Sequence, residues 1–431
     1  MLPTLKYETL QCGFVPGGLA ANGVYLLNRA AELSCEWKVP LYVAQLDLRK
    51  AFDQVKHSAV LDGLKMQGVS LQCLAVLCML LKQSTAILTM ANVRGEPLRL
   101  QRGLPQGAPE SPLLFTIVTE FVLRPLLRQW RSLGYEWCCD GFCLSALCYA
   151  DDIILVSSSK KHLEKMVAQT LEAFADVGLA VSTEKCHWSS CPTKPQSRLK
   201  FGADRLCWEP TFTFVGSVIA FCGNDGPAIN YRLAQATKVY FRWKDVLQCK
   251  SVCKRLRILL TIRTVFSALL WLSETWTPTA AQRKKLESWG ARTIARVVRV
   301  NRYPDEDGIQ HWRRLHRTGH AVLASYGGIE VQRRRRLHGF AGHVARLPEG
   351  LLYTALRTRS LSWWRAFQSR RLVKHPRRFS PWRWEQQLEN FFGVARSIFV
   401  DEDVGWRAFA QDRVRWRSCR DTFAKSAGND E

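Results

Sequence analysis

The stretch from Ser145 to Ser159, SALCYADDIILVSSS, limits the possible folds of this chain more than any other feature of its sequence. Two apolar, β-prone runs flank adjacent aspartates, which is typical of a β-hairpin whose tight turn carries Asp151 and Asp152. Carboxylates beside apolar strands are costly to desolvate unless cations meet them, and a pair of divalent ions is one solution. The alternative is an ordinary surface turn, where aspartate is common. The choice depends on what the rest of the chain places beside this hairpin.

Composition and charge define the class of protein. A chain of 431 residues, 47% hydrophobic and 11% aromatic, can bury a sizeable core, so we expect two or three folded domains. The net charge of +25 is uneven: residues 1–253 carry 27 Lys and Arg against 21 Asp and Glu, whereas residues 254–431 carry 35 against 16. Such an excess of cations favours a polyanion partner, nucleic acid before membrane.

The cysteines and the apolar runs indicate the compartment. The fifteen cysteines are scattered and no secretory signal precedes them, so we expect reduced thiols in a nuclear or cytoplasmic protein that is not secreted. No run reaches the roughly 18 to 20 apolar residues that a membrane span needs. Cys186, His187 and Cys191 come nearest to a zinc cluster, but they lack a fourth ligand at the usual spacing.

A third acid follows another apolar strand. Residues 41–46 are predicted to form a strand that ends on Asp47, and a carboxylate at the end of a buried strand is a usual position for a catalytic group. The alternative is a helix N-cap, because the residues from Lys50 onward can start a helix. Farther on, Gly103 and Gly107 lie in the loop QRGLPQGAPESPLLF. Such a loop before a helix offers backbone N–H groups to a phosphate or a base pair.

The remaining periodicities predict a mixed fold that becomes helical toward the carboxyl end. One strand is expected at 211–219 and a hairpin around 93–96. Helices are predicted at 19–36, within 59–82, and at 111–130, 160–177, 228–249, 252–273 and 279–299.

Arginine and tryptophan dominate the carboxyl-terminal part. Ten of the 16 tryptophans and thirty arginines lie from Lys254 onward, beside only five lysines. Interleaved Arg and Trp suit stacking on bases and contacts with phosphates, although Trp at helical spacing is more often a core residue. The run Arg333 to Arg336 resembles a nuclear localisation signal, but a solvated helix face is the simpler interpretation.

Five segments in one order resemble the palm of reverse transcriptases. They are LDLRKAFD, LPQGAPESPLLF, YADD, GLAVSTEK and FVGS, which together span residues 41–219. KAFD, ESPLLF and the opening LQCGFVPGG are similar to non-LTR (LINE-type) retrotransposons and their group II intron relatives. The resemblance implies an α+β fold, with the palm and part of the fingers of a right-hand polymerase in residues 1–226. A helical thumb in 227–300 and a basic, mainly helical nucleic-acid-binding region in 301–431 would follow.

The resemblance also implies a chemistry: RNA-directed DNA polymerisation by two-metal nucleotidyl transfer. Such an enzyme extends a DNA 3′ end along an RNA template with deoxynucleoside triphosphates and two Mg²⁺ ions, which Mn²⁺ can replace. Asp47 and Asp151 would be the main metal ligands, and Asp152 a supporting acid beside them. Lys185 would be the general acid for the leaving pyrophosphate, or else an ordinary surface lysine.

The same resemblance assigns the substrate contacts. Phe52 would be the steric gate that excludes a 2′-OH, a role compatible with core packing. Gln106, with Gly107 beside it, would contact the incoming nucleotide. The backbone near Arg49 and Lys50 would lie close to the triphosphate.

One departure from the pattern leaves a second function open. Basic finger residues are expected before the LQCGF segment, but only Lys6 precedes it here. The alternative hypothesis is therefore an amino-terminally truncated, inactive relic that only binds nucleic acid. An RNA-dependent RNA polymerase would share the palm, but Phe52 and the YADD turn argue against it.

Overall fold

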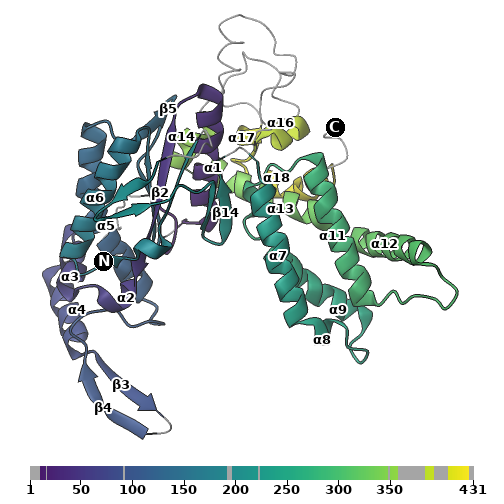
Figure 1. Cartoon of the computed structure of the whole chain (residues 1–431), viewed down its shortest axis with the longest axis horizontal. Helices are drawn as coiled ribbons and strands as arrows, with labels where there is room; N and C mark the ends of the chain where they lie inside the picture. Colours follow the sequence, from purple (N-terminus) through teal and green to yellow (C-terminus); the bar gives the residue numbers. More distant parts are fainter. Residues whose placement is uncertain are drawn as a thin grey trace, which may run out of the picture. The chain divides into compact units, whose positions relative to one another are not determined.

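The computed structural model describes residues 10–15, 17–90, 93–191, 197–221, 224–347, 350–357, 384–392 and 406–426 (Figure 1). The chain divides into two compact units. The first consists of residues 1–26 and 33–215, and the second of residues 27–32 and 216–431.

A six-stranded sheet forms the centre of the first unit. The order is β1-β7-β8-β2-β10, with β9 also paired to β2, and β1–β7 is the parallel pair in a sheet whose other pairs are antiparallel. This confirms the expected mostly antiparallel α+β fold. The strands are β1 (Leu10–Gln11), β2 (Leu41–Arg49), β7 (Ala146–Tyr149), β8 (Asp152–Ser157), β9 (Ala180–Val181) and β10 (His187–Cys191).

Alternation along β2 gives the sheet two different faces. Ala44, Leu46 and Leu48 belong to a hydrophobic core that includes Phe115 and Phe174, so this face is covered by α5 and α6. The intervening residues of β2, Gln45 and Asp47 among them, point to the other face. The helices of this unit are α2 (Ala51–Gln54), α3 (His57–Met66), α4 (Leu71–Gln83), α5 (Ser111–Ser132) and α6 (Lys160–Asp176), while α1 (Ala20–Trp37) contributes to both units.

The helix ends follow the sequence signals. Pro112 lies in the first turn of α5, where its missing N–H is harmless. After α6 the chain turns at Gly178, which has a left-handed φ of +84°. The helices expected at 19–36, 111–130 and 160–177 are therefore confirmed within one or two residues at each end.

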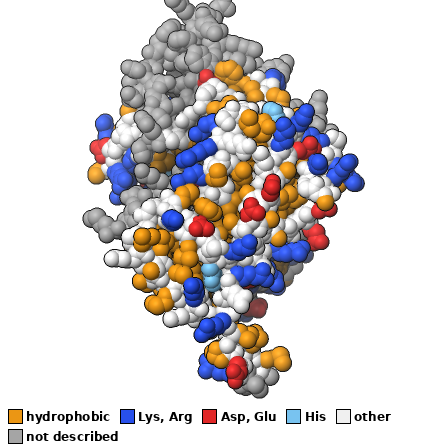
Figure 2. Space-filling model, turned by 90° about the vertical axis from the view of Figure 1, so that its left-hand side faces the viewer, with side chains coloured by type: hydrophobic (Ala, Val, Ile, Leu, Met, Phe, Trp, Pro, Cys, Tyr) orange, Lys and Arg blue, Asp and Glu red, His pale blue; other side chains and the backbone are white. Residues whose placement is uncertain are grey.

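A second antiparallel pair, β3 (Thr85–Met90) and β4 (Val93–Arg99), follows α4. The hairpin predicted around 93–96 is therefore displaced, because β4 runs through those residues and pairs with β3 before them. Figure 2 shows apolar and basic side chains mixed on the surface on this side of the molecule. The exposed apolar side chains of α4 and the hairpin are Leu71, Val76, Met79, Leu80, Ile87, Leu88, Met90 and Leu98.

The expected single strand at 211–219 is wrong in detail. Two strands, β13 (Thr211–Phe214) and β14 (Ser217–Ala220), flank a turn at Val215 and Gly216. Both turn residues have positive φ, of 49° and 73°, which an uninterrupted strand cannot contain.

The second unit is mainly helical, as predicted. Its helices are α7 (Gly226–Arg242), α8 (Lys244–Leu247), α9 (Lys254–Thr261), which continues as a π-helical turn (Ile262–Phe266) into α10 (Ser267–Leu269), α11 (Ala280–Val298), α12 (Gly308–Ser325), α13 (Gly328–Ala345), α14 (Leu351–Arg357), α16 (Gln386–Phe392), α17 (Trp406–Phe409), α18 (Arg413–Ser418) and α19 (Arg420–Lys425). No helix in the described ranges is long and apolar enough to span a bilayer.

The arginine run of α13 is not a solvated face. Arg333 and Arg334 are each 0% exposed. Arg333 donates to both carboxylate oxygens of Glu330, at 2.8 and 2.6 Å, and to the Gln387 side chain at 2.6 Å. The guanidinium of Arg334 lies over the Phe423 ring, 4.3 Å from its centroid. Both the solvated-face interpretation and an accessible localisation signal are therefore wrong at these two positions.

Candidate active site

The hairpin that carries Asp151 and Asp152 is formed by β7 and β8. Tyr149 pairs with Asp152, so the two residues of the turn are Ala150 and Asp151. The expectation that both acids lie in the turn is therefore wrong, since Asp152 is the first residue of β8. Ala150 has a φ of +55°, a left-handed conformation that allows the reversal in two residues.

Strand register brings Asp47 to this hairpin. β2 and β8 are antiparallel, and Asp47 is the direct partner of Asp152. Direct cross-strand partners have Cβ atoms about 4.5 to 5.5 Å apart on the same face of the sheet. The structure therefore gathers the carboxylates of Asp47, Asp151 and Asp152 at one end of two central strands, although 104 residues separate Asp47 from Asp151.

The three acids repel one another. Burial raises the pKa of Asp152 to about 6, and the charges of Asp151 and Asp47 contribute to that rise. Burial also raises the pKa of Asp151, and the charge of Asp47 adds to the effect. The Oδ2 atom of Asp47 is shielded from solvent and accepts no hydrogen bond from the described residues. Carboxylate oxygens are the ligands that divalent cations prefer, and a bound cation would offset the repulsion among these acids. In this structure the oxygens of the three acids do not all lie within 4.8 Å of one another, so an ion would have to draw them together.

Lys185 reaches the same place from a neighbouring segment. It lies in a short 3-10 helix, Thr183–Lys185, between β9 and β10, and both of these strands pair with β2. Its Nζ is 3.5 Å from Oδ2 of Asp47, and its side chain is 71% exposed. The lysine is thus both a neighbour of the acids and accessible to a substrate.

Two further residues contact the acids and were missed by the sequence analysis. Gln45 donates to Oδ1 of Asp152 at 3.4 Å and to the carbonyl of Thr213 at 2.8 Å. The backbone N–H of Asp47 donates to Sγ of Cys186 at 3.5 Å, and burial raises the pKa of this thiol to about 11. The available signal was the polar Gln45, two residues before Asp47 in an otherwise apolar strand and therefore on the same face.

The Gly/Pro loop docks on the segment that follows β2. The N–H of Leu104 donates to the carbonyl of Phe52 at 2.6 Å, and Gln106 donates to the carboxylate of Asp53 at 3.0 Å. Gly103 has a φ of +90°, and a Cβ there would lie 2.8 Å from the carbonyl oxygen of Asp53. Only glycine permits this close approach.

The substrate residues expected from the sequence form a second group around this loop. Phe52 is partly buried and stacks on Phe115, with ring centroids 5.0 Å apart. Arg49 and Lys50 are exposed at the junction of β2 and α2, where Lys50 has a φ of +45°. Gly107 is also exposed, with a φ of +92°. Arg49, Lys50 and Phe52 follow Asp47 within five residues, whereas Gly107 comes from the docked loop.

Comparison with known proteins identifies the family. Residues 4–219, half of the chain, match the family model described as reverse transcriptase (RNA-dependent DNA polymerase). The chain belongs to the reverse transcriptase family.

The relatives of this reverse transcriptase chain are proteins of mobile elements. It is 32% identical over 182 residues to the Pol polyprotein of the type-1 retrotransposable element R2 of Nasonia vitripennis, a match that covers 42% of this chain and 17% of the relative. It is 25% identical to the Pol polyprotein of element R2DM of Drosophila melanogaster, over 45% of this chain and 18% of the relative. These matches confirm the expected kinship with non-LTR reverse transcriptases, of which the chain spans about a sixth of the length.

Two further similarities extend beyond the palm. A transposon-derived protein of Caenorhabditis elegans, F52C9.6, is 26% identical over 64% of this chain and 95% of its own length. A telomerase structure from Candida tropicalis covers 78% of this chain and 54% of that chain at 13% identity, but its TM-score of 0.38 is too low to support an argument.

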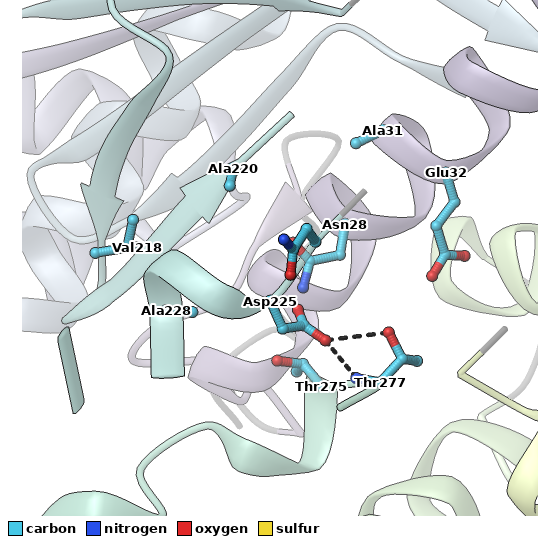
Figure 3. Close-up of a pocket in the computed structure, with 10 residues that line it drawn as sticks. Asn28, Ala31, Glu32, Val218, Ala220, Asp225, Ala228, Thr275 and Thr277 are labelled. Carbon is cyan, nitrogen blue, oxygen red and sulfur yellow. Dashed lines mark hydrogen bonds between the residues drawn. The ribbon is translucent and has the colours of Figure 1, made fainter. Parts of the chain in front are cut away.

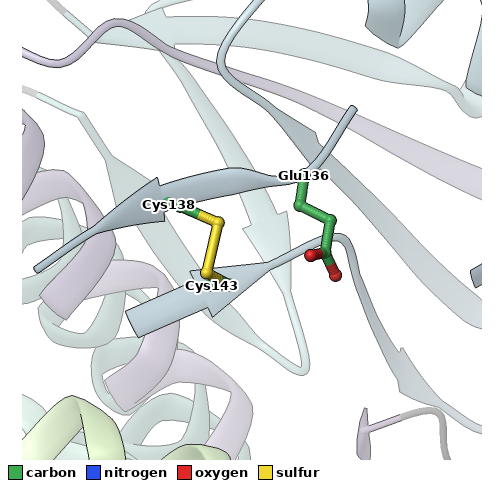
Figure 4. Close-up of side chains that lie close together, drawn as sticks. All are labelled: Glu136, Cys138 and Cys143. Carbon is green, nitrogen blue, oxygen red and sulfur yellow. A yellow bond between two sulfur atoms is a disulfide. The ribbon is translucent and has the colours of Figure 1, made fainter. Parts of the chain in front are cut away.

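The reverse transcriptase chain holds another close group of ligand-type side chains, Glu136, Cys138 and Cys143 (Figure 4). Cys138 and Cys143 are direct partners on β5 (Trp137–Cys139) and β6 (Phe142–Leu144), and their sulfur atoms form a disulfide. The expectation that every cysteine is reduced is wrong for this pair. Because both sulfurs are bonded to each other, they are not thiolate ligands. Within the described ranges, this is also the one cluster of three such groups, so Cys186, His187 and Cys191 form none.

A polar pocket within the second unit is structural (Figure 3). Asp225 accepts hydrogen bonds from the backbone N–H and the hydroxyl of Thr277, at 2.5 and 3.1 Å. Glu32, from α1, pairs with Arg29 at 3.0 Å. Both carboxylates of the pocket therefore have close partners within the protein, whereas the acids of the palm also repel one another.

Of the four tryptophans of residues 301–431 that the structure describes, three are core residues and Trp312 is exposed. Trp384, Trp406 and Trp416 are 2 to 4% exposed. The Trp416 indole donates to the carbonyl of His338 at 3.1 Å and stacks on its ring, with centroids 4.0 Å apart. At these positions the core alternative is correct. Trp363, Trp364 and Trp382 lie outside the described residues.

Proposed function

We propose that this reverse transcriptase chain extends a DNA 3′ end along an RNA template by nucleotidyl transfer, as the polymerase part of a non-LTR retroelement. The observation that carries the proposal is the convergence of three carboxylates at the ends of β2 and β8. The family match and the R2 relatives support RNA-directed DNA polymerisation. The docked loop beside Phe52 supports a nucleotide as the substrate.

Two divalent ions are the cofactors that these carboxylates fit best. We assign Asp47 and Asp151 as the main ligands of Mg²⁺, with Mn²⁺ as a substitute, and Asp152 as the supporting acid. Bound ions would act as Lewis acids and neutralise the charge that develops on the phosphates. Gln45 holds Asp152 by its hydrogen bond, and the stable Cys186 thiol holds the backbone at Asp47.

The remaining residues have separate tasks. Lys185 lies beside Asp47, and its exposed ammonium would donate a proton to the leaving pyrophosphate. Phe52, fixed by its stacking on Phe115, would exclude a ribose 2′-OH. Gln106 and Gly107 would contact the nucleotide, and the chain at Arg49 and Lys50 the triphosphate.

The helical second unit is the candidate for holding the nucleic acid. We infer a thumb in residues 227–300 and a nucleic-acid-binding region in 301–431. Because Arg333, Arg334 and three of the tryptophans in this region are buried, the contacts must come from the residues that remain exposed. On α12 these include Trp312, Arg313 and Arg317, and this helix has no acidic residue.

Single-nucleotide extension of a DNA primer on an RNA template, with Mg²⁺, tests the proposal. The unmodified chain should add a deoxynucleotide, and Asp151→Asn should give no detectable product. Asp62→Asn is the matched control, because Asp62 is an exposed aspartate of α3 and its loss should leave extension unchanged. Extension that survives Asp151→Asn would show that the site is wrongly assigned.

The binding-only alternative predicts a different result from the same proteins. A relic would bind RNA and DNA with an affinity that falls steeply with salt, through counterion release, and that is unchanged by Asp47→Asn. Product from the unmodified chain excludes this alternative. Binding without product from either protein would establish it.

A further inference from the structure

Outside the palm, α12 carries a row of rings along one side of the helix. Trp312, His316 and His320 are spaced four residues apart, so they lie one turn above another. The rings of Trp312 and His316 are stacked, with centroids 5.1 Å apart and planes at 22°. The centroids of His316 and His320 are 4.3 Å apart. The nucleotidyl transfer proposed above uses neither histidine.

The two histidines place their Nε2 atoms close to each other. The Nε2 atoms of His316 and His320 are 3.3 Å apart. In a tetrahedral zinc site with Zn–N bonds of about 2.0 to 2.1 Å, two nitrogen ligands are about 3.3 to 3.4 Å apart. Histidines four residues apart on one helix face also form the paired zinc ligands of the His-Glu-x-x-His type of site. In the structure the two Nε2 atoms are hydrogen-bonded to each other at this distance, so an ion would take the place of the proton that they share.

A metal ion binds the neutral form of histidine, in which one ring nitrogen has a free lone pair. The third histidine of the helix is engaged elsewhere, since Nδ1 of His311 lies 3.2 Å from the carboxylate of Glu306. Glu306 in turn pairs with Arg314 at 2.6 Å. His311 is therefore a natural comparison for the other two.

We propose that His316 and His320 form a binding site for a transition-metal ion, and that zinc is the ion it takes. Imidazole nitrogens favour Zn²⁺ over Mg²⁺, which prefers oxygen ligands, so this site is chemically distinct from the carboxylates of the palm. Among the described residues no third His, Cys, Asp or Glu completes the group, and water fills the other coordination positions. The stacked Trp312 supports His316 in its ligating orientation.

The readout must be specific for these residues, because free cysteines and the palm carboxylates also bind Zn²⁺. We would label the histidines with ¹³C and follow the ring C–H signals by NMR while adding Zn²⁺ in excess Mg²⁺. His316→Gln and His320→Gln each assign one signal. The proposal expects the signals of His316 and His320 to shift together with one common dissociation constant, while that of His311 stays in place.

The single variants decide between a two-ligand site and independent binding. Removing even a second-shell partner weakens metal affinity by about 10- to 100-fold, so losing one of two ligands should weaken it at least as much. We therefore expect His320→Gln to remove the response of His316 over the same Zn²⁺ range, and His311→Gln to leave both responses intact. The proposal is overturned if His316 and His320 do not respond, or if either still titrates normally without the other. Primer extension is a separate assay, so neither result depends on polymerase activity.

Discussion

The two units differ in how their charged side chains are paired. In the first, Asp47, Asp151 and Asp152 share one end of two strands, and Oδ2 of Asp47 has no hydrogen-bond donor among the described residues. In the second, the buried Arg333 donates to Glu330 and Gln387. Carboxylates that repel one another and have a largely exposed lysine, Lys185, as their neighbour indicate a place where something else must bind, whereas fully paired buried charges indicate structure. Sequence alone suggested the reverse for the arginines, whose run from Arg333 to Arg336 was interpreted as a solvated helix face.

The comparison predicts that an acid of the palm is needed for activity and not for stability. Asp47→Asn should reduce kcat/KM for primer extension by about 10³-fold or more, because several kcal/mol of metal-dependent stabilisation are lost. It should not lower the Tm, because the change removes repulsion from Asp152. Steady-state extension and thermal unfolding of the same protein, with Asp62→Asn alongside, measure both effects. A large drop in Tm would mean that the acids hold the fold together and would remove the contrast between the units.

The buried Arg333, by contrast, should be needed for stability. Arg333→Met leaves the carboxylate of Glu330 buried without its partner, and breaking a buried pair in this way costs about 3–5 kcal/mol. Urea unfolding measures the loss, and Arg317→Met, on the exposed side of α12, should stay within about 0.5 kcal/mol of the parent. Adding Glu330→Leu to Arg333→Met should restore part of the stability, because the unpaired charge is then removed. A negligible cost for Arg333→Met would show that this pair is not structural.

Because the pKa of Asp152 is raised, the stability of the protein should depend on pH. The folded-state pKa is about 6, above the ordinary value of 3.8, so the folded protein binds a proton more tightly than the unfolded chain between those values. Stability should therefore fall as pH rises through this window, and Asp152→Asn should remove that part of the slope. Near neutral pH the variant should be more stable by about 1–3 kcal/mol, and near pH 4 the two proteins should be alike. Urea titrations in chelator at several pH values test this, and parallel stability curves for the two proteins would contradict it.

Sequence reasoning predicted the elements that carry the site, and strand register explains what it missed. Apolar runs and helical spacing located β2, β8, α5 and α6, and the motif order gave the three acids. The direct pairing of Asp47 with Asp152 could not be read from them, because register across 105 residues depends on how the whole sheet folds. For the same reason, Gln45 and Cys186 became visible as neighbours only in the structure.

The carboxyl-terminal region was the harder part to predict, for a physical reason. Arginine is usually exposed, so a run from Arg333 to Arg336 favours a surface until its partners are known. Those partners, such as Gln387 for Arg333 and Phe423 for Arg334, come from segments more than fifty residues later. Composition gives the residue types but does not predict which side chains are in contact. The helical character, by contrast, follows from local spacing and was correctly predicted.

The smallest predicted effect tests whether the backbone of the β7–β8 turn is strained, in addition to the repulsion among its acids. Ala150 adopts a φ of +55° in the turn, and a left-handed conformation costs a residue with a Cβ about 1–2 kcal/mol. Ala150→Gly removes that cost but adds about 0.5–1 kcal/mol of unfolded-state entropy, so the net gain should lie between about 0 and about 1.5 kcal/mol. Ala44→Gly, in the buried middle of β2, is the matched control and should be destabilising, because no strain is relieved there. If Ala150→Gly is as destabilising as Ala44→Gly, the turn is relaxed, and charge repulsion alone distinguishes the palm site from the paired charges of the second unit.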